Sequence, residues 1–577
     1  MIDYPSLVLP EDPKEAQKIF QSLPVQNQLG LVLQSRGKDR LATLFLSEHP
    51  EELIQSFPEQ EIFLTIKEVG EKDCLELISL TTPEQLQYLL DIEFWKRDQI
   101  DPEKVLHWME ILLESGEKKV VQFIRSTDSE LIALALKKFL RVNTLEGEVT
   151  EGMDKVPLFT LDQYYFIGFK GVKAREVFEP FLKIFNRIDR EGYQRLMDSL
   201  VYELELEVEE TEYRLRNGRL NDYGFPDFEE ALEIYRFVNP DSLVKRERSR
   251  SVESSSEESK RESSFYYLTF YSEGPFFSTI LSQIDHPQEM DRLKQEITAL
   301  CNKAIVAEAI DLSNISGMER SVQRVYHYLN LGLQYLSQEE EKKALEILRV
   351  FPIQKIFQCG ASLPILLRRK AETILKGSWF GGDQENLLLL DPPHLGKLEG
   401  VLRRRPLFYR NGVDDDFKAL RDLKEMEVFL ESIEGIVSFL GETVRVSPLS
   451  LKGMDLSGCH PERWQEITLS TIFLTSLANQ ILLGTFKFEA IEPDHLKDLF
   501  LRLFERDDQG KGVIKMGFRN ELKEWFQSIE GESQRRDHLV AFQDFCLDLL
   551  EEQFGKIPPG EDIDPRFVKG LLIRICV

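Results

Sequence analysis

The sequence predicts a predominantly all-α protein. Three features predict this: helix starts built from proline and acidic residues recur, apolar residues follow them every three or four positions, and few stretches favour a β-strand. A chain of 577 residues is longer than one hydrophobic core supports, so several domains are expected. The composition divides the chain into four regions, namely residues 1–145, 155–243, 244–264 and 265–577.

The first region, residues 1–145, is predicted to be a helical superhelix of short amphipathic helices. A boundary residue, a proline and acidic residues recur in this order at His49, Phe57, Thr82 and Asp101. Proline fits the first helical turn because the N–H group there has no partner, and acidic side chains are favoured by the helix dipole. Helices this short are stable only when they bury their apolar sides against neighbours, so we expect them to stack.

The second region, residues 155–243, is predicted to be helical with one small β element. The aromatic stretch Leu158–Gly171 favours a short strand, at most within a hairpin. The segment from Tyr202 to Leu215 begins with alternating apolar and acidic residues, which is typical of a strand, but its apolar residues also keep a helical spacing. Because the helical spacing continues through the polar residues, we predict a helix there.

The rest of the chain is predicted to be a linker and a larger helical domain. Residues 244–264 combine charges of both signs with serine, so they cannot bury enough apolar surface and are predicted to be a disordered linker. Residues 265–577 are predicted to form a helical C-terminal domain. Within it, Ile467–Gly484 is free of charged residues, but its Thr, Ser, Asn and Gln side chains favour a buried core helix over a membrane-spanning one.

The segment Arg214–Asp227 is rich in residues that specify local structure. The Asn217-Gly218 pair predicts a turn, and Gly224 predicts a positive φ. Asp227 predicts a capping box with the glutamate three residues later, at the start of a helix. Together these features predict a corner between two helices.

Four polar side chains of this corner, Arg214, Arg216, Arg219 and Asp222, have no local role, and with Tyr223 they form a candidate site. They can hold the corner together by ion pairs with the glutamates between 203 and 212, or they can bind an anionic or small-molecule ligand. The ligand-binding candidates are Arg214, Arg216, Arg219, Asp222 and Tyr223.

A second cluster of arginines lies in Arg403–Gly412, around a Phe and a Tyr. Arginine and aromatic side chains together bind phosphate or single-stranded nucleic acid, but the aspartates at 414–416 can also neutralise these arginines at a solvated helix end. The phosphate-binding candidates are Arg403, Arg404, Arg405 and Arg410.

The sequence lacks the common catalytic and metal-binding motifs. It has no phosphate-binding Gly-Lys loop, dinucleotide-binding glycine motif, zinc-protease helix or serine-hydrolase elbow. The histidines are not at ligand spacing, and Cys459 with His460 is interpreted as part of a helix boundary. The loop at Asp507 resembles a calcium loop but has Phe518 where a bidentate Glu is required, so we interpret it as a turn or hairpin. We therefore predict no catalytic residue, no metal and no cofactor.

The composition gives expectations about surroundings and partners. The 100 acidic and 72 basic residues give a net charge of −28, which repels nucleic acid and anionic lipid. The six cysteines are scattered without a C-x-x-C pair, which is typical of reduced thiols, and the N-terminus does not resemble a signal peptide. We expect a cytoplasmic bacterial protein with one or more protein partners, no nucleic acid and no membrane insertion.

Two resemblances add to this interpretation. Residues 41–113, which include "LSEHPEELIQSFPEQEIFLTIKEVG", resemble the helical superhelix in the cytosolic domain of MgtE-type magnesium transporters and in flagellar motor-switch proteins. The whole chain is similar to an uncharacterised bacterial family with a domain of unknown function. This second resemblance rests on the segments "TTPEQLQYLLD", "RNGRLNDYGFPDFEEALEIY", "NKAIVAEAID", "YLNLGLQYL" and "RRRPLFY" in this order. The first resemblance implies a superhelical fold, and the second implies no activity.

These observations leave three functional hypotheses. The leading one is a noncatalytic scaffold or protein-interaction protein, since stacked helices offer extended concave surfaces and no catalytic motif is present. The second is an enzyme of unrecognised type with an anion or small-molecule site at the Arg214–Asp227 corner. The third, based on the transporter resemblance alone, is an ion-responsive cytosolic regulator.

Overall fold

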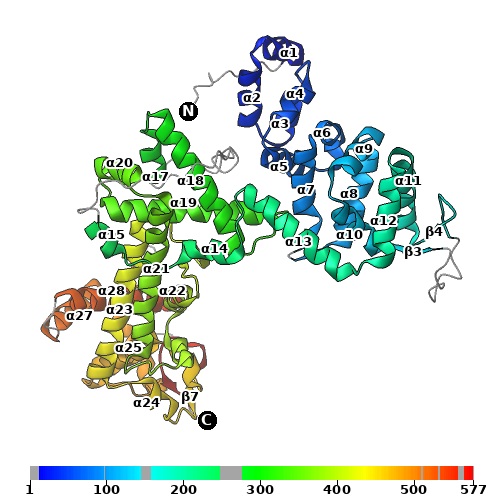
Figure 1. Ribbon diagram of the computed structural model, residues 1–577. Helices are drawn as coiled ribbons and strands as arrows, with labels where there is room; N and C mark the ends of the chain where they lie inside the picture. The colour runs from blue at the N-terminus through cyan, green and yellow to red at the C-terminus, as the bar shows by residue number, and fades with distance from the viewer. Residues whose placement is uncertain are drawn as a thin grey trace. The chain divides into compact units, whose positions relative to one another are not determined.

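The structure is predominantly α-helical, which confirms the predicted fold class (Figure 1). This computed structural model describes residues 12–96, 98–144, 158–246, 276–507, 511–529, 533–555 and 564–575. The strands of the described residues are short and pair in two-stranded antiparallel sheets. The chain divides into two compact units, Met1–Gln358 and Cys359–Val577. The narrower domain ranges expected from the sequence stay predictions.

The first unit begins with a succession of short helices joined by short links. These helices are α1 (Pro13–Ser22), α2 (Val25–Gln34), α3 (Gly37–Leu44), α4 (Pro50–Gln55), α5 (Glu59–Val69), α6 (Leu75–Leu80), α7 (Pro83–Glu93), α8 (Pro102–Glu114), α9 (Glu117–Ser126) and α10 (Ser129–Phe139). All four predicted helix starts are confirmed, at α4, α5, α7 and α8. At α7, Thr82 and Gln85 form a reciprocal capping box, with the Gln85 N–H donating to the Thr82 hydroxyl at 3.1 Å.

Buried polar side chains tie these helices together by capping their C-termini. The last carbonyl groups of an α-helix have no partner within the helix, so another group must satisfy them where they are buried. Arg40 of α3 donates to two carbonyl oxygens at the end of α2. Gln85 of α7 donates to the carbonyl oxygen of Ile54 in α4 at 2.7 Å. Lys119 of α9 donates to the carbonyl oxygen of Thr81, just after α6, at 2.8 Å. Each cap comes from a later helix, so these contacts fix the helices against one another.

A small sheet and three longer helices follow. Strand β3 (Leu140–Thr144) pairs with β4 (Tyr165–Phe169), so the strand predicted within Leu158–Gly171 is confirmed. Its main partner β3 lies upstream of the predicted β element and was not predicted. The helices are α11 (Val172–Ile188), α12 (Arg190–Tyr202) and α13 (Glu205–Asp222). Helix α13 confirms the helix predicted between Tyr202 and Leu215, after a short break at 203–204.

The predicted corner is built differently from the expectation. Asn217 and Gly218 lie inside α13, so the predicted turn is wrong; contacts made by residues on both sides of the pair hold it in the helix. Gly224 has a φ of 88°, as predicted. Asp227 does precede a helix, α14 (Phe228–Leu232), but its side chain makes no capping hydrogen bond, so the capping box is also wrong.

The first unit continues through the helices that follow α14. They are α15 (Pro240–Arg246), α17 (Phe276–Ser282), α18 (Pro287–Ala307), α19 (Ile315–Ser337) and α20 (Glu341–Val350). Residues 244–246, at the start of the predicted linker, belong to α15, where Pro240 begins the helix and Leu243 is buried. The bounds of the linker stay a prediction. Residues 247–264 of that linker lie outside the described residues.

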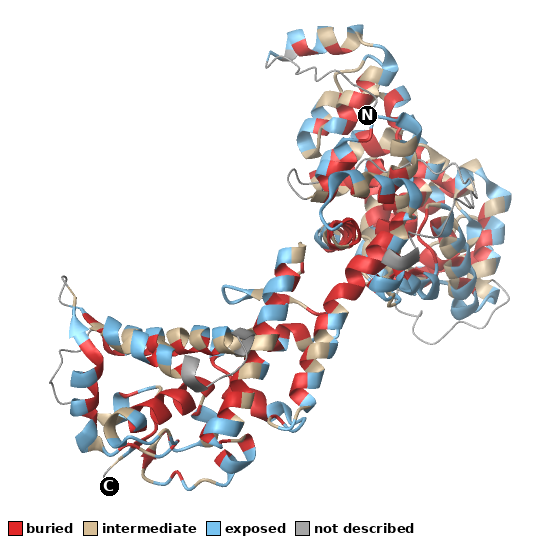
Figure 2. Ribbon diagram, turned by 90° about the vertical axis from the view of Figure 1, so that its left-hand side faces the viewer, coloured by how far each residue is buried: buried red, intermediate tan, exposed pale blue. Residues whose placement is uncertain are grey.

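The second unit is also helical. Its helices are α21 (Ile353–Lys376), which begins in the first unit, α22 (Pro392–Leu402), α23 (Leu420–Phe439), α24 (Pro448–Lys452), α25 (Leu469–Leu483), α26 (Leu496–Leu503), α27 (Met516–Ile529) and α28 (Ser533–Phe554). Every residue of α25 from Leu469 to Asn479 is buried, which confirms the core helix predicted for Ile467–Gly484; Figure 2 colours the chain by burial. Among the described helices, none combines the length and apolar character needed to cross a membrane.

Short strands and turns complete both units. The remaining strands are β1 (Trp95–Lys96), β2 (Gln99–Ile100), β5 (Phe408–Arg410), β6 (Val413–Asp415), β7 (Cys459–His460), β8 (Phe504–Arg506), β9 (Gly512–Ile514) and β10 (Ile573–Arg574). The 3₁₀ turns are Lys72–Cys74, Glu233–Tyr235, Gln384–Leu389, Trp464–Glu466, Pro493–His495 and Pro565–Phe567, and Leu440–Val444 is a π turn. The hairpin predicted at Asp507 is confirmed by β8 and β9. The helix boundary predicted at Cys459–His460 is wrong, because these residues form β7 and pair with β10 near the C-terminus.

Candidate functional site

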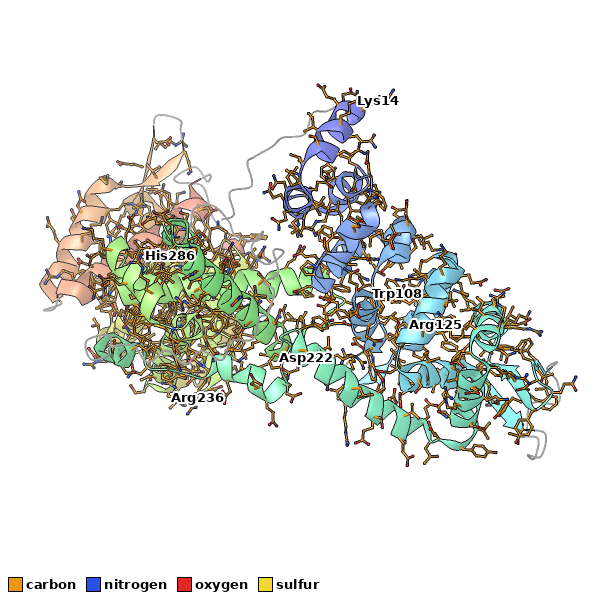
Figure 3. The ribbon with its side chains drawn as sticks, turned by 45° about the horizontal axis from the view of Figure 1, so that its top comes forward. Lys14, Trp108, Arg125, Asp222, Arg236 and His286 are labelled. Carbon is orange, nitrogen blue, oxygen red and sulfur yellow. The ribbon has the colours of Figure 1, made fainter. Side chains whose placement is uncertain are left out.

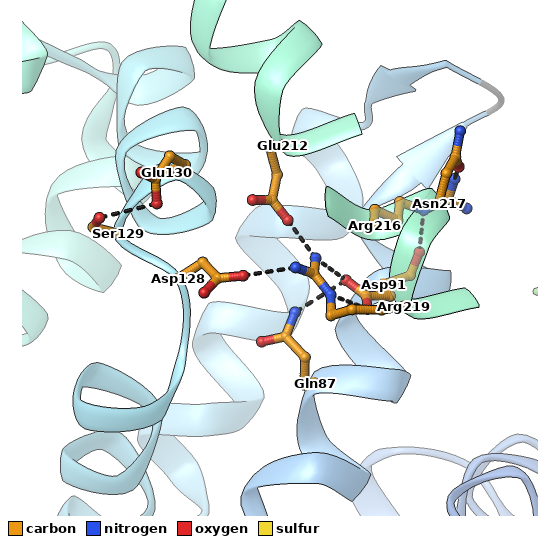
Figure 4. A network of polar contacts seen from close by, with 9 residues as sticks. All are labelled: Gln87, Asp91, Asp128, Ser129, Glu130, Glu212, Arg216, Asn217 and Arg219. Carbon is orange, nitrogen blue, oxygen red and sulfur yellow. Dashed lines mark hydrogen bonds and ion pairs between the residues drawn. The ribbon is translucent and has the colours of Figure 1, made fainter. Parts of the chain in front are cut away.

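Helix α13 places Arg219 against α7, where it forms a bidentate ion pair (Figure 4). The Arg219 Nε atom donates to Asp91 Oδ2 at 2.8 Å, and Nη2 donates to Asp91 Oδ1 at 2.7 Å. Gln87, one helical turn before Asp91, donates to the same carboxylate at 3.0 Å. Two parallel hydrogen bonds to a carboxylate are among the strongest polar contacts in proteins, so this pair fixes α13 on α7.

Two further carboxylates share the Arg219 guanidinium. Its Nη1 atom donates to Asp128 Oδ2 at 2.6 Å, just before α10, and its Nη2 atom also donates to Glu212 within α13. We call Gln87, Asp91, Asp128, Glu212 and Arg219 the Arg219 cluster. It joins α7, the start of α10 and α13 around one cation.

The two inner carboxylates of the cluster are buried. The side chains of Asp91 and Glu212 are 1% and 0% exposed, whereas that of Arg219 is 22% exposed. Burial raises the pKa of Glu212 to about 7, although Arg219 acts to lower it. Burial also raises the pKa of Asp91, against the effect of Arg219. Glu212 Oε2 has no hydrogen-bond partner among the described residues. With a pKa of about 7, this carboxyl group takes up a proton near neutral pH.

Arg216 lies one turn before Arg219 and has no carboxylate in direct contact among the described residues. Its Nε atom donates to the main-chain carbonyl of Asp91, and its guanidinium lies 5.3 Å from the centre of the Trp95 ring. Burial lowers the pKa of Arg216. The hydrogen bond caps the last turn of α7, and the contact with Trp95 is a cation–π interaction. Both contacts have a structural use.

The other three candidates of the corner are separated from this cluster or pack beside it. Arg214 is 76% exposed and pairs with Glu210 one turn earlier. Asp222 is exposed at the end of α13 (Figure 3). The ring of Tyr223 packs edge-on against Tyr88, with 4.7 Å between the ring centres. The structure therefore brings together Arg216 and Arg219 but not the full candidate set, and ligand binding by these residues stays a prediction.

The arginines at 403–410 surround the hairpin of β5 and β6. Arg403 contacts Asp414 at 2.5 Å and Arg405 contacts Asp416 at 3.9 Å. Arg410 contacts Asp422 of α23 at 3.0 Å. Arg404 is exposed. Three of these four candidates therefore face a carboxylate of the protein itself, which reduces their positive charge toward a phosphate.

The Arg219 cluster has the geometry of a joint between helices. Each nitrogen atom of the Arg219 guanidinium donates to a carboxylate of the protein, and both Asp91 oxygens accept from it. The sequence offered Glu212 as a partner, among the glutamates at 203 to 212, but it did not point to Asp91 or Asp128. Asp91 could have been recognised as a partner, because it is a carboxylate among the apolar residues of α7. A buried carboxylate requires a cationic partner. In the part of the chain that the structure describes, no group of three or more His, Cys, Asp or Glu side chains is placed to hold a metal ion.

Comparison with known proteins assigns the chain to a family. The family model described as "Family of unknown function (DUF6178)" matches residues 17–574, so the chain belongs to this family. No curated protein and no solved structure matches the chain. The resemblance of residues 41–113 to the MgtE-type transporter domain and to motor-switch proteins therefore stays a prediction.

Proposed function

We propose that this member of the DUF6178 family is a noncatalytic scaffold protein that binds other proteins. The observation that carries the proposal is the Arg219 cluster. The residues that the sequence offers most clearly for ligand binding are engaged by carboxylates and a carbonyl of the same chain. They hold three helices in place, which is the role of a framework that presents a surface.

The helical array of the first unit supports this proposal. Caps donated from later helices, such as those of Gln85 and Lys119, make neighbouring helices depend on one another. Stacked helices of this kind present long surfaces formed by many short segments, which suit binding to other proteins.

An exposed apolar edge between α12 and α13 also supports it. Tyr202, Leu204 and Leu206 are 70%, 65% and 79% exposed, although large apolar side chains in one short segment are normally covered. The segment is held in place, because Lys137 donates to the carbonyl oxygens of Ser199 and Glu203 at 2.6 and 3.0 Å. A fixed apolar segment loses little entropy on binding, which favours a protein partner.

The proposed location is the bacterial cytoplasm. The five described cysteines are buried free thiols, which suits a reducing compartment. The net charge of −28 disfavours nucleic acid as a partner.

The test is affinity purification of the full-length protein from the cells that produce it, followed by cross-linking and native mass spectrometry. We expect a stoichiometric protein partner whose yield falls in the Leu204→Ser/Leu206→Ser variant, with Leu449→Ser of the second unit as the matched exposed control. A small molecule that copurifies and is lost in Arg216→Ala would instead favour the enzyme hypothesis. A bound divalent ion that shifts the melting temperature would favour the ion-responsive regulator.

A further inference from the structure

A small apolar pocket lies between α25 and α27 in the second unit. Its volume is about 140 Å³, close to that of a cavity that holds a benzene molecule. The pocket is lined by Leu477, Gln480, Ile481, Phe486, Phe518, Glu521, Leu522 and Trp525. Nothing in the scaffold proposal uses these residues.

The helix faces on both sides of the pocket are fixed by neighbouring aromatic contacts. The four α27 residues of the lining recur at helical spacing, so they share one face of that helix. Next to this face, Phe526 stacks on Phe473 of α25, with 6.0 Å between the ring centres. Trp525 packs on Phe486 at 4.8 Å. The pocket is therefore bounded by side chains that are already held in position.

The lining has the chemistry of a site for an organic cation. Phe486, Phe518 and Trp525 offer aromatic rings, whose faces attract cations, and the remaining apolar side chains favour a ligand covered by methyl groups. Glu521 is exposed at the pocket and has no ion-pair partner in the described part of the chain. A carboxylate beside aromatic rings favours a positive charge and repels an anion. A neutral apolar ligand would fill the pocket without using this charge.

We propose that this pocket binds a methylated ammonium group, carried by a small molecule or by a side chain of a partner. Such a group is compact and weakly hydrated, so it fits an apolar pocket of this size and keeps its charge near Glu521. The aromatic rings attract the cation, and the carboxylate adds a longer-range attraction. The proposal is independent of the scaffold function.

The test compares choline with 3,3-dimethyl-1-butanol, a neutral molecule of nearly the same shape, by calorimetric titration of the full-length protein. We expect choline to bind about tenfold more tightly, the difference that a desolvated cation–π contact with a nearby carboxylate supplies. Glu521→Gln should weaken the binding of choline at least threefold and leave the affinity for the alcohol unchanged. Trp525→Leu should weaken choline more than the alcohol.

A matched control is Glu524→Gln, which removes a nearby exposed carboxylate that does not line the pocket. Its choline affinity should equal that of the unmodified protein. Equal affinities for choline and the alcohol would overturn the proposal, as would an unchanged choline affinity in Glu521→Gln. Failure to detect either molecule at about 50 mM, far above the range expected for a preformed site, would overturn it as well.

Discussion

Replacement of Glu212 by Gln tests the electrostatics of the Arg219 cluster. The pKa of Glu212 is raised to about 7 in the folded protein, compared with about 4.3 in an unfolded chain. As the pH rises through this interval, the unfolded state releases its proton first, so the free energy of unfolding falls. The loss amounts to about 4 kcal/mol and is complete above about pH 7.

Glutamine keeps the shape of the protonated carboxyl group and does not titrate. Its carbonyl oxygen can still accept from Arg219, and its amide takes the place of the Oε2 atom that has no partner. We therefore expect Glu212→Gln to be more stable than the unmodified protein by about 1 kcal/mol at pH 5 and by about 3–4 kcal/mol at pH 8. The direction is informative, because removing a carboxylate from an ion-pair network normally destabilises a protein.

The assay is hydrogen exchange of α13 amides at pH 5 and at pH 8, which reports the free energy of local opening. At each pH the variant is compared with the unmodified protein, so that the intrinsic exchange rate cancels. The control is Glu210→Gln, which removes a carboxylate that pairs with exposed Arg214 and with no other cation in the described part of the chain. It should change the opening free energy by less than about 0.5 kcal/mol. A loss of stability at both pH values, or a gain of equal size at both, would refute the reasoning.

Three other changes give outcomes of predictable sign. Arg219→Ala leaves the buried carboxylates of Asp91 and Glu212 without a cation, so the free energy of unfolding measured in urea should fall by about 3–5 kcal/mol. The exposed control Arg214→Ala should lower it by less than about 0.5 kcal/mol. Similar losses in both variants would contradict a structural role for Arg219. Burial lowers the pKa of Lys119 to about 7, so the stability of the unmodified protein rises with pH above that value. The free energy of unfolding of Lys119→Met should therefore fall by about 2 kcal/mol relative to that of the unmodified protein between pH 6 and pH 9. A difference between the two proteins that does not change with pH would argue against a lowered pKa for Lys119. Gly218→Ala, inside α13 with open space around it, should add about 0.5–1 kcal/mol to the free energy of unfolding and raise the melting temperature. Gly224→Ala, at positive φ, should remove about 1 kcal/mol and lower the melting temperature. The opposite order would place the turn at Gly218 after all.

The parts of the fold that could be predicted are those fixed by nearby residues. The helix starts at His49, Phe57, Thr82 and Asp101 depend on a proline and on acidic residues within one turn. The core helix α25 depends on the composition of one segment. The pairing of β3 with β4 and of β7 with β10 depends on segments that are separated along the chain, and short strands carry little pattern of their own.

The candidate site shows how one local assignment affects a whole interpretation. Glu212, Arg216 and Arg219 follow one another at intervals of four and three residues, which puts them on one face of a helix. That face is visible in the sequence only if the helix continues through Asn217 and Gly218. Treating the pair as a turn separates Glu212 from Arg219, so the sequence did not show which carboxylate pairs with which arginine. A ligand site therefore stayed open as an alternative to ion pairs. The pair tolerates the helix because Gly218 lies on its exposed side, while the residues on either side of it are held against α7. Tertiary contacts therefore determine the backbone here, and the same contacts engage the charges for which the sequence left ion pairing and ligand binding open.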